Sequence, residues 1–317
     1  MRVFSAFTTA VLLSGAELPT SDIVLASPLR TATMNVLLDR QVVPKWEHGS
    51  LLTFSPDRPE VRVFDGSGNI RFDVEVHPPE SLQVQIRDLS AAPNGRFAVA
   101  GTAYGEGGAY SQFLAWLDSS GKIDKYSQIN DAGILKICFG PDNALWALVR
   151  VFGDKQEFKE VARYDLLRRY DSDGKLTRTA VPRSQFPERR HPGHTAKLVA
   201  SGSSIGVYFA RSRTWIELSP EGAVRQTLRT DLPPDLEVSG VAMTEDQVLL
   251  TTYGTDEEHG ALKPALYHLD RELGHWSAVD ASVIRIGKKP LLLFGYDGDA
   301  LVLSTGLPKL SWVAVSR

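Results

Sequence analysis

The sequence predicts an all-β fold: a six-bladed β-propeller of four-stranded antiparallel blades, with the ring closed by an N-terminal strand. Three observations predict it: a turn that recurs about every fifty residues, short strands on both sides of that turn, and the lack of any long helical period. The glycines of the turn are spaced 53, 53, 48 and 52 residues apart, which is typical of propellers and solenoids. The copies are Asp65–Gly68, Asp118–Gly121, Asp171–Gly174, Ser219–Gly222 and Asp270–Gly274.

Each of these turns lies between two short segments, several of which alternate apolar and polar residues, the period of a half-buried strand. The Asp or Ser side chain is expected to bond to nearby backbone, and the glycine to take the positive φ that closes a hairpin. A second, tighter turn precedes each pair and leads into an apolar strand, so that each repeat contains four strands. This second turn lies at residues 48–49, 94–95, 142–143, 202–203, 245–246 and 298–299.

The second turn occurs six times and the Asp-x-x-Gly turn only five times, which predicts how the ring closes. The last repeat runs to a third strand, Ser311–Val315, and the chain then stops one strand short. Because an open sheet edge is a liability, we expect the missing outer strand to come from the N-terminal segment Asp22–Met34. A seven-bladed ring with one degenerate blade is the alternative.

The composition is that of a globular protein, with 317 residues, 43% hydrophobic and 23% charged. The net charge of −3 gives no overall electrostatic case for nucleic acid or an anionic membrane, so neither is expected as a partner. No segment reaches the length of a membrane span. The single cysteine, Cys138, excludes an internal disulfide, and its apolar surroundings predict a buried thiol, with a catalytic thiol as the alternative.

The beginning of the chain predicts a division into a leader, residues 1–21, and one propeller domain, residues 22–317. Arg2 precedes the apolar run Val3–Leu13 and the small residues Ser14–Ala16, which are the three regions of a secretory signal peptide. We therefore expect a periplasmic or extracellular protein. A cytoplasmic protein with an ordinary N-terminal strand is the alternative.

The repeats resemble those of the six-bladed propellers of the NHL-repeat, TolB and gluconolactonase-like superfamily. The resemblance covers about residues 22–317 and depends on the repeat length, on the hairpin Tyr170–Lys175 and on Pro93–Arg96 and Pro141–Asn143. These motifs are structural, so the resemblance implies a fold and no particular activity. Gluconolactonase-like relatives hold a metal with a Glu, an Asn and an Asp in the central channel, and no such set is matched in this sequence.

Both repeated turns are tight and share one face of the predicted disc, so the longer and more varied connections share the other. Loops on a rigid scaffold are where binding residues concentrate, which makes the long-loop face the expected binding face. A basic cluster there suits a small anionic ligand or a protein partner of unknown identity; a solvated basic surface is the alternative. The cluster comprises Arg183, Arg189, Arg190, His191, His194, Arg211 and Arg213.

Other candidates are weaker. Tyr104 and Tyr110 flank a glycine-rich loop and are candidate stacking residues for a sugar or peptide, or simply the ends of a mobile hairpin. His191 and His194 are spaced to share a metal but lack an identified third ligand. The acidic loop 256–259 is expected to be a charged surface. The channel mouth is a further candidate, with basic residues at matching positions on the inner strands: Arg87, Lys136 and Lys197.

Reaction motifs are missing from the sequence: it has no His-Glu-x-x-His, and no Gly-x-Ser-x-Gly in the strand-to-helix setting that a nucleophile elbow requires. No catalytic residue, metal ligand or cofactor is therefore assigned. Whether the protein is an enzyme is left open, although the missing motifs favour a non-catalytic protein. We expect a non-catalytic, ligand- or protein-binding propeller. A metal-dependent hydrolase or lyase acting at the central channel, similar to the lactonases, is the alternative.

Overall fold

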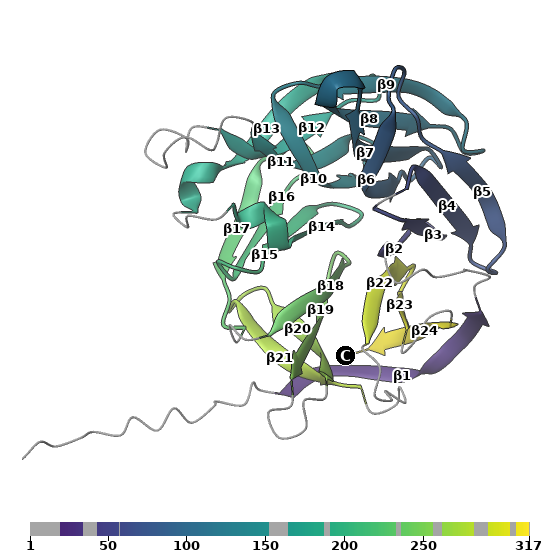
Figure 1. Cartoon of the computed structure of the whole chain (residues 1–317). Coiled ribbons are helices and arrows are strands. Elements are labelled where there is room, and N and C mark those ends of the chain that lie inside the picture. The colour runs from purple at the N-terminus through teal and green to yellow at the C-terminus, as the bar shows by residue number, and fades with distance from the viewer. Residues whose placement is uncertain are drawn as a thin grey trace, which may run out of the picture.

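Small β-sheets arranged in a ring make up the structure, a computed structural model (Figure 1). It describes residues 20–33, 43–56, 58–151, 164–186, 191–232, 236–255, 262–281, 291–304 and 309–316. Within these ranges the only helices are short 3-10 turns: η1 (Glu106–Gly108), η3 (Arg183–Gln185) and η4 (Pro192–Thr195). None of the helices in these ranges is long and apolar enough to cross a membrane. The predicted all-β class is confirmed.

Four of the sheets contain four antiparallel strands each, joined in chain order. The first is β2 (Val43–Glu47), β3 (Ser50–Phe54), β4 (Glu60–Asp65) and β5 (Ile70–Glu75). The second is β6 (Gln83–Ala91), β7 (Phe97–Tyr104), β8 (Tyr110–Leu117) and β9 (Ile123–Ile129). The third is β10 (Ala132–Phe139), β11 (Leu145–Val151), β12 (Asp165–Tyr170) and β13 (Leu176–Pro182). The fourth is β14 (Ala196–Ala200), β15 (Ile205–Phe209), β16 (Thr214–Leu218) and β17 (Val224–Arg229).

The remaining strands form one eight-stranded sheet, which corrects the expectation of six separate sheets. One half is β18 (Glu237–Met243), β19 (Val248–Thr255), β20 (Leu262–Asp270) and β21 (His275–Asp280). The other half is β1 (Thr20–Thr33), β24 (Lys309–Ser316), β23 (Ala300–Ser304) and β22 (Leu292–Asp297). The halves merge because β1 is long: it pairs with β24 along most of its length and also meets β21 in parallel, where Thr20 lies opposite Ala278.

The N-terminal strand closes the ring, as expected from the unequal turn counts. In β1, Leu25 lies opposite Val315 and Thr33 opposite Lys309, so the outermost strand of this half-sheet comes from the opposite end of the chain. Arg30 of β1 reinforces the closure, because its guanidinium stacks over the Trp312 ring at 4.0 Å and pairs with Asp297 at 2.7 Å.

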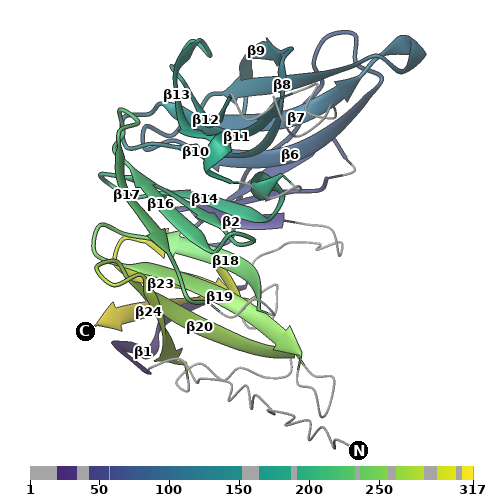
Figure 2. The ribbon, with the colours of Figure 1, turned by 90° about the vertical axis from the view of Figure 1, so that its left-hand side faces the viewer.

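The first strand of each repeat lies nearest the middle of the ring, and the last strand lies at the rim (Figure 1). Each inner strand contacts the next in the order β2, β22, β18, β14, β10 and β6. The circle is closed because β6 also contacts β3 of the first sheet. Seen on edge, the sheets lie one beside another across the disc (Figure 2). The inner strands therefore line a common channel.

The Asp-x-x-Gly turns have the predicted geometry. Asp65 Oδ1 accepts hydrogen bonds from the backbone N–H of Ser67 (2.8 Å) and of Asn69 (2.9 Å), which holds the turn. In the next two copies, Gly121 and Gly174 have φ of 87° and 70°. A Cβ at Gly174 would also lie 3.0 Å from Trp116 of the preceding sheet. Glycine thus serves both the turn and the contact between sheets.

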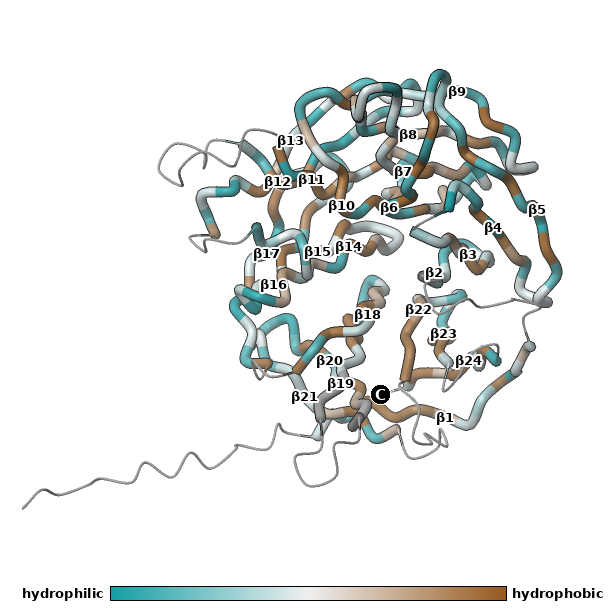
Figure 3. The backbone as a smooth tube through the Cα atoms, in the orientation of Figure 1, coloured by the Kyte–Doolittle hydropathy of each residue, from teal (hydrophilic) through white to brown (hydrophobic). Residues whose placement is uncertain are grey.

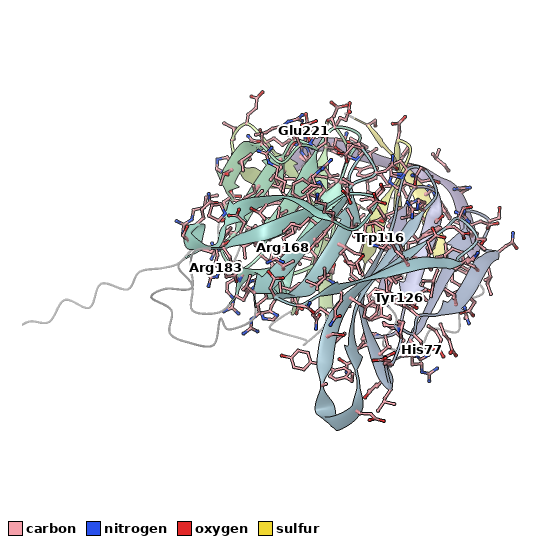
Figure 4. All side chains as sticks on the ribbon, turned by 90° about the horizontal axis from the view of Figure 1, so that it is seen from above. His77, Trp116, Tyr126, Arg168, Arg183 and Glu221 are labelled. Atoms are coloured by element: carbon pink, nitrogen blue, oxygen red, sulfur yellow. The ribbon has the colours of Figure 1, made fainter. Side chains whose placement is uncertain are left out.

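The hydrophobic core is divided among the spaces between neighbouring sheets. The described residues form six apolar clusters: five each join two adjacent sheets, and the sixth joins the halves of the eight-stranded sheet. Apolar residues gather along inner strands such as β10 and β22 (Figure 3). The two faces of the disc carry different connections: Glu221, in an Asp-x-x-Gly-type turn, and His77, between two sheets, lie on opposite sides, with Trp116 between them (Figure 4).

Candidate anion site in the central channel

Three inner strands place a charged residue at the same depth of the channel. Asp88 on β6, Lys136 on β10 and Lys197 on β14 each pair with the fourth residue of the next strand, opposite Ala100, Leu148 and Tyr208. The shared register follows from the repeat, since each inner strand is followed by a tight turn and then an apolar strand. The fold therefore brings side chains about fifty residues apart into one ring.

A register shift lies beside two of these positions, Asp88 in β6 and Lys136 in β10, and it recurs at equivalent places in β18 and β22. The pairing of β14, which carries Lys197, is regular. A β-bulge inserts one residue, bends the strand and re-aims the next side chain, and bulges are common beside functional sites.

The channel contains a cavity of about 280 Å³ near these residues. Its wall is part polar and part apolar: residues such as Phe139 and Val241 line it together with charged residues such as Lys136 and Lys197. The cavity reaches the tight turns His48–Gly49 and Gly298, so it extends toward the tight-turn face. The sequence pointed to the opposite face as the binding face, which stays a prediction. The cavity is an additional candidate, because loop length does not reveal where the inner strands leave space.

One of the three lysines of the cavity is neutralised by a network. Lys45 Nζ lies 2.7 Å from Glu47 Oε1 and 3.9 Å from Asp88 Oδ2, and it donates to the carbonyl oxygen of Ile137 at 2.8 Å. Burial acting by itself would lower the pKa of Lys45, but the Asp88 and Glu47 carboxylates outweigh it and hold that pKa above its ordinary value. Lys45 is thus a fixed cation, and the two carboxylates beside it outweigh its charge.

The two carboxylates are equally well satisfied. Glu47 Oε2 accepts from Ser90 Oγ and from the Ala91 N–H, each at 2.7 Å. Asp88 accepts from the Leu89 N–H at 3.0 Å and from the Ile137 N–H at 2.8 Å. The network therefore joins β2, β6 and β10, and its carboxylates are already occupied by donors of the protein.

The other two lysines of the cavity, Lys136 and Lys197, differ from Lys45 in their charged neighbours. Lys197 Nζ donates to the carbonyl oxygen of Ser239 at 3.1 Å. Within the described ranges, no carboxylate lies at ion-pair distance from Lys136 or Lys197. Burial and the Lys136 charge lower the pKa of Lys197 to about 8, although Glu237 and Asp88 act in the opposite direction. Lys136 and Lys197 therefore share one cavity, with no carboxylate of the described residues at ion-pair distance from either, an arrangement that favours an anion.

The basic residues predicted on the long-loop face are brought together only in part. Arg189 and Arg190 lie outside the described residues. Partial burial of the His194 ring, together with the charges of Arg150 and Arg211, lowers the pKa of His194. Arg213 is half-buried, and its carbonyl oxygen accepts from Thr230. Their role in binding remains a prediction.

The two histidines of this cluster do not point at a common ligand. His191 Nδ1 accepts from the Gly193 N–H at 3.1 Å, so the proton of the neutral ring is on Nε2, which lies 3.0 Å from Tyr164 Oη. Burial, with the charges of Arg183 and His194, lowers the pKa of His191 to about 3. Both ring nitrogens of His191 are occupied, and no group of three His, Cys, Asp or Glu suited to a metal occurs within the described ranges.

Tyr104 and Tyr110 face each other at the end of the hairpin formed by β7 and β8, with ring centroids 6.5 Å apart. Tyr104 Oη donates to Gln85 at 3.2 Å, and Tyr110 is 59% exposed. This hairpin, with η1 at its tip, projects from the ring (Figure 2). It remains a candidate contact surface separate from the channel.

Among the basic residues predicted at the channel mouth, Lys136 and Lys197 line the cavity, whereas Arg87 is not among its lining residues and donates to Gln85. The sequence did not identify Lys45, Glu47 and Asp88. A signal was present, because charged residues interrupt inner strands that are otherwise mostly apolar. Cys138 is 1% exposed, and burial raises the pKa of its thiol, which agrees with the expected buried role.

No protein-family model matches the chain, and no curated protein matches it in sequence. Solved structures similar in fold include a Bacteroides fragilis protein named as exported, with a TM-score of 0.60 and 9% identity over 94% of this chain and 98% of that chain. A DUF4221 family member from Bacteroides vulgatus has a TM-score of 0.53 and 10% identity over 93% and 99%. A luciferin-regenerating enzyme has a TM-score of 0.50 and 10% identity over 91% and 95%. At such identities the likeness establishes the fold alone: the chain is a β-propeller.

Proposed function

We propose that the protein is a binding propeller that takes a small anionic ligand in its central channel, between Lys136 and Lys197. The observation that carries this proposal is the contrast among three lysines of one cavity. Lys45 is paired with Glu47 at 2.7 Å, whereas Lys136 and Lys197 have no such partner among the described residues.

The energetics favour this assignment. Burial removes hydration from the Lys197 ammonium and the Lys136 charge repels it, and an anion between the two lysines offsets both effects. Each ammonium has several N–H donors for carboxylate or phosphate oxygens. A cavity of about 280 Å³ suits a ligand at the small end of the usual range.

We further propose that the eight-stranded sheet acts as two blades, which makes the ring six-bladed. The closed order of six inner strands and the apolar cluster between its two halves support this interpretation. The propeller domain is then residues 22–317, with residues 1–21 as a leader and the protein exported. Support for export comes from the three-part N-terminal sequence and from the fold shared with a protein named as exported.

Thermal unfolding with different anions at constant ionic strength tests the proposed function. We expect acetate, phosphate or citrate to raise the melting temperature relative to chloride, by about 3 °C at about ten times Kd. Lys136→Met and Lys197→Met should each abolish most of this shift. Lys175→Met is the matched control, because Lys175 is exposed in an Asp-x-x-Gly turn and should leave the shift unchanged. Equal shifts in all four proteins would refute binding at the lysine pair.

A further inference from the structure

Lys197 has the surroundings of a nucleophilic amine. Its Nζ is fixed by the carbonyl oxygen of Ser239 at 3.1 Å, on the neighbouring inner strand β18. The same cavity is lined by apolar residues such as Val241 and by charged residues such as Lys136. A lysine amine becomes a useful nucleophile when burial and a second cation favour its neutral form, and Lys197 has both.

The charged groups around Lys197 come from three strands. Lys136 on β10 favours loss of its proton, and burial acts in the same direction. Glu237 on β18 and Asp88 on β6 oppose this effect, and the balance is a pKa of about 8. At pH 7 about a tenth of Lys197 is therefore neutral, whereas for an exposed lysine the neutral fraction is below about a thousandth.

We propose that Lys197 forms an imine with the carbonyl carbon of a small 2-oxo carboxylate, whose carboxylate group pairs with the Lys136 ammonium. This inference rests on the proposed function and narrows its ligand class from small anions to anions that carry a ketone or aldehyde next to the carboxylate. The two lysines then have separate roles: Lys136 orients the carboxylate, and Lys197 bonds to the carbonyl carbon.

The step is balanced without a co-reactant. The nitrogen lone pair of neutral Lys197 attacks the carbonyl carbon, a proton passes from nitrogen to oxygen, and a carbinolamine results. The C–O bond then breaks, the second nitrogen proton leaves with the hydroxyl group as water, and the C=N bond forms. The only other product is one water molecule, and hydrolysis reverses the reaction.

Reductive trapping tests the imine. The full-length protein is incubated at pH 7 with limiting pyruvate and cyanoborohydride, and the labelled lysine is located by peptide mass mapping. We expect Lys197 to be labelled about tenfold faster than the exposed Lys122 and Lys175, because more of it is neutral. Its labelling rate should rise with pH to a plateau, with a midpoint near its pKa of about 8.

Variants separate the roles of the two lysines. Lys197→Met should remove the selective label, while Lys136→Met should retain some label but lose the preference for pyruvate over acetone, which has no carboxylate. Statistical labelling of all lysines, with Lys197 no faster than Lys122, would overturn the imine proposal. If acetate or phosphate still stabilised the protein in that case, anion binding would stand and only the covalent step would fail. Loss of both effects would reject both proposals.

Discussion

Lys45 Nζ and Glu47 Oε1 lie 2.7 Å apart on one face of the inner strand β2, and this pair neutralises one of the three lysines of the channel. The same glutamate accepts from Ser90 and Ala91 of β6, and the same lysine donates to Ile137 of β10. The pair therefore links three neighbouring inner strands, and it leaves Lys136 and Lys197 as the cations available to a ligand.

The first prediction concerns this link. In Glu47→Gln, the amide must turn its NH₂ group toward Lys45 or toward the Ala91 N–H, both of which are donors. We expect the free energy of unfolding to fall by about 2 kcal/mol, since a largely buried ion pair is broken and a buried donor is left unsatisfied. Urea unfolding followed by tryptophan fluorescence measures this change as a lower midpoint with an unchanged slope.

Glu75→Gln is the control for Glu47→Gln. Glu75 is an outer-strand glutamate whose side chain is 62% exposed and lies 3.3 Å from the exposed His77 ring, so we expect little change in the midpoint. Equal midpoints for Glu47→Gln and Glu75→Gln would show that the link between the three inner strands contributes nothing to stability.

The second prediction concerns the pH dependence that Lys197 imposes. Its pKa is about 8 in the folded protein and 10.5 in the unfolded chain. Between these values the unfolded chain retains a proton that the folded chain has released, so stability rises with pH. Below pH 8 both states are protonated and the folded state carries the full penalty of the buried charge. Lys197→Met should thus be more stable than wild type by about 2 kcal/mol at pH 7, and the advantage should shrink toward pH 10.

Chemical denaturation of both proteins at pH 7, 8.5 and 10 measures this difference. A saturating anion should reduce the advantage of Lys197→Met at pH 7, because the bound charge compensates the ammonium of wild type. If the variant were destabilised by the same amount at every pH, the penalty assigned to the charged amine would be wrong.

The third prediction concerns ring closure by β1. Leu25 is 1% exposed and packs with Val313 and Leu293 in the cluster between the two halves of the eight-stranded sheet. Leu25→Ala should lower the free energy of unfolding by about 3 kcal/mol, the usual result of truncating a buried leucine. Leu29 lies on the same strand but is 66% exposed, so Leu29→Ala should change the free energy of unfolding by less than about 0.5 kcal/mol. Similar losses for the two variants would argue against β1 as part of the core.

Much of this fold was predictable because its repeats are local. Turns such as Asp65–Gly68 combine a side chain that bonds backbone with a glycine at positive φ, and both are visible in the sequence. The pairing of β1 with β24 was expected because the last repeat of the sequence contains only three strands and needs a fourth from the N-terminal segment. The merger into an eight-stranded sheet was not predictable, because the parallel contact between Thr20 and Ala278 depends on how far β1 extends past the rim of its neighbour.

The site was less predictable, for a physical reason. Loop length suggested a binding face, but the cavity extends along the inner strands, where matched register rather than loop sequence brings Lys136 and Lys197 together. Their difference from Lys45 depends on Glu47 and Asp88, which come from two separate strands. Sequence patterns show the charges but not which of them are paired.

The last prediction concerns His191, whose pKa is about 3 in the folded protein and 6.5 in the unfolded chain. As pH falls from 6.5 toward 3, His191 becomes protonated in the unfolded chain but stays neutral in the folded chain. This residue therefore lowers the free energy of unfolding as the pH decreases. His191→Gln should be less stable than wild type at pH 7.5, by about 1 kcal/mol, because the hydrogen bonds to Gly193 and Tyr164 are disturbed. At pH 4.5 the deficit should vanish or reverse. Urea unfolding at both pH values tests this, with the exposed His77→Gln as control; parallel pH profiles for wild type and His191→Gln would exclude a neutral, buried His191.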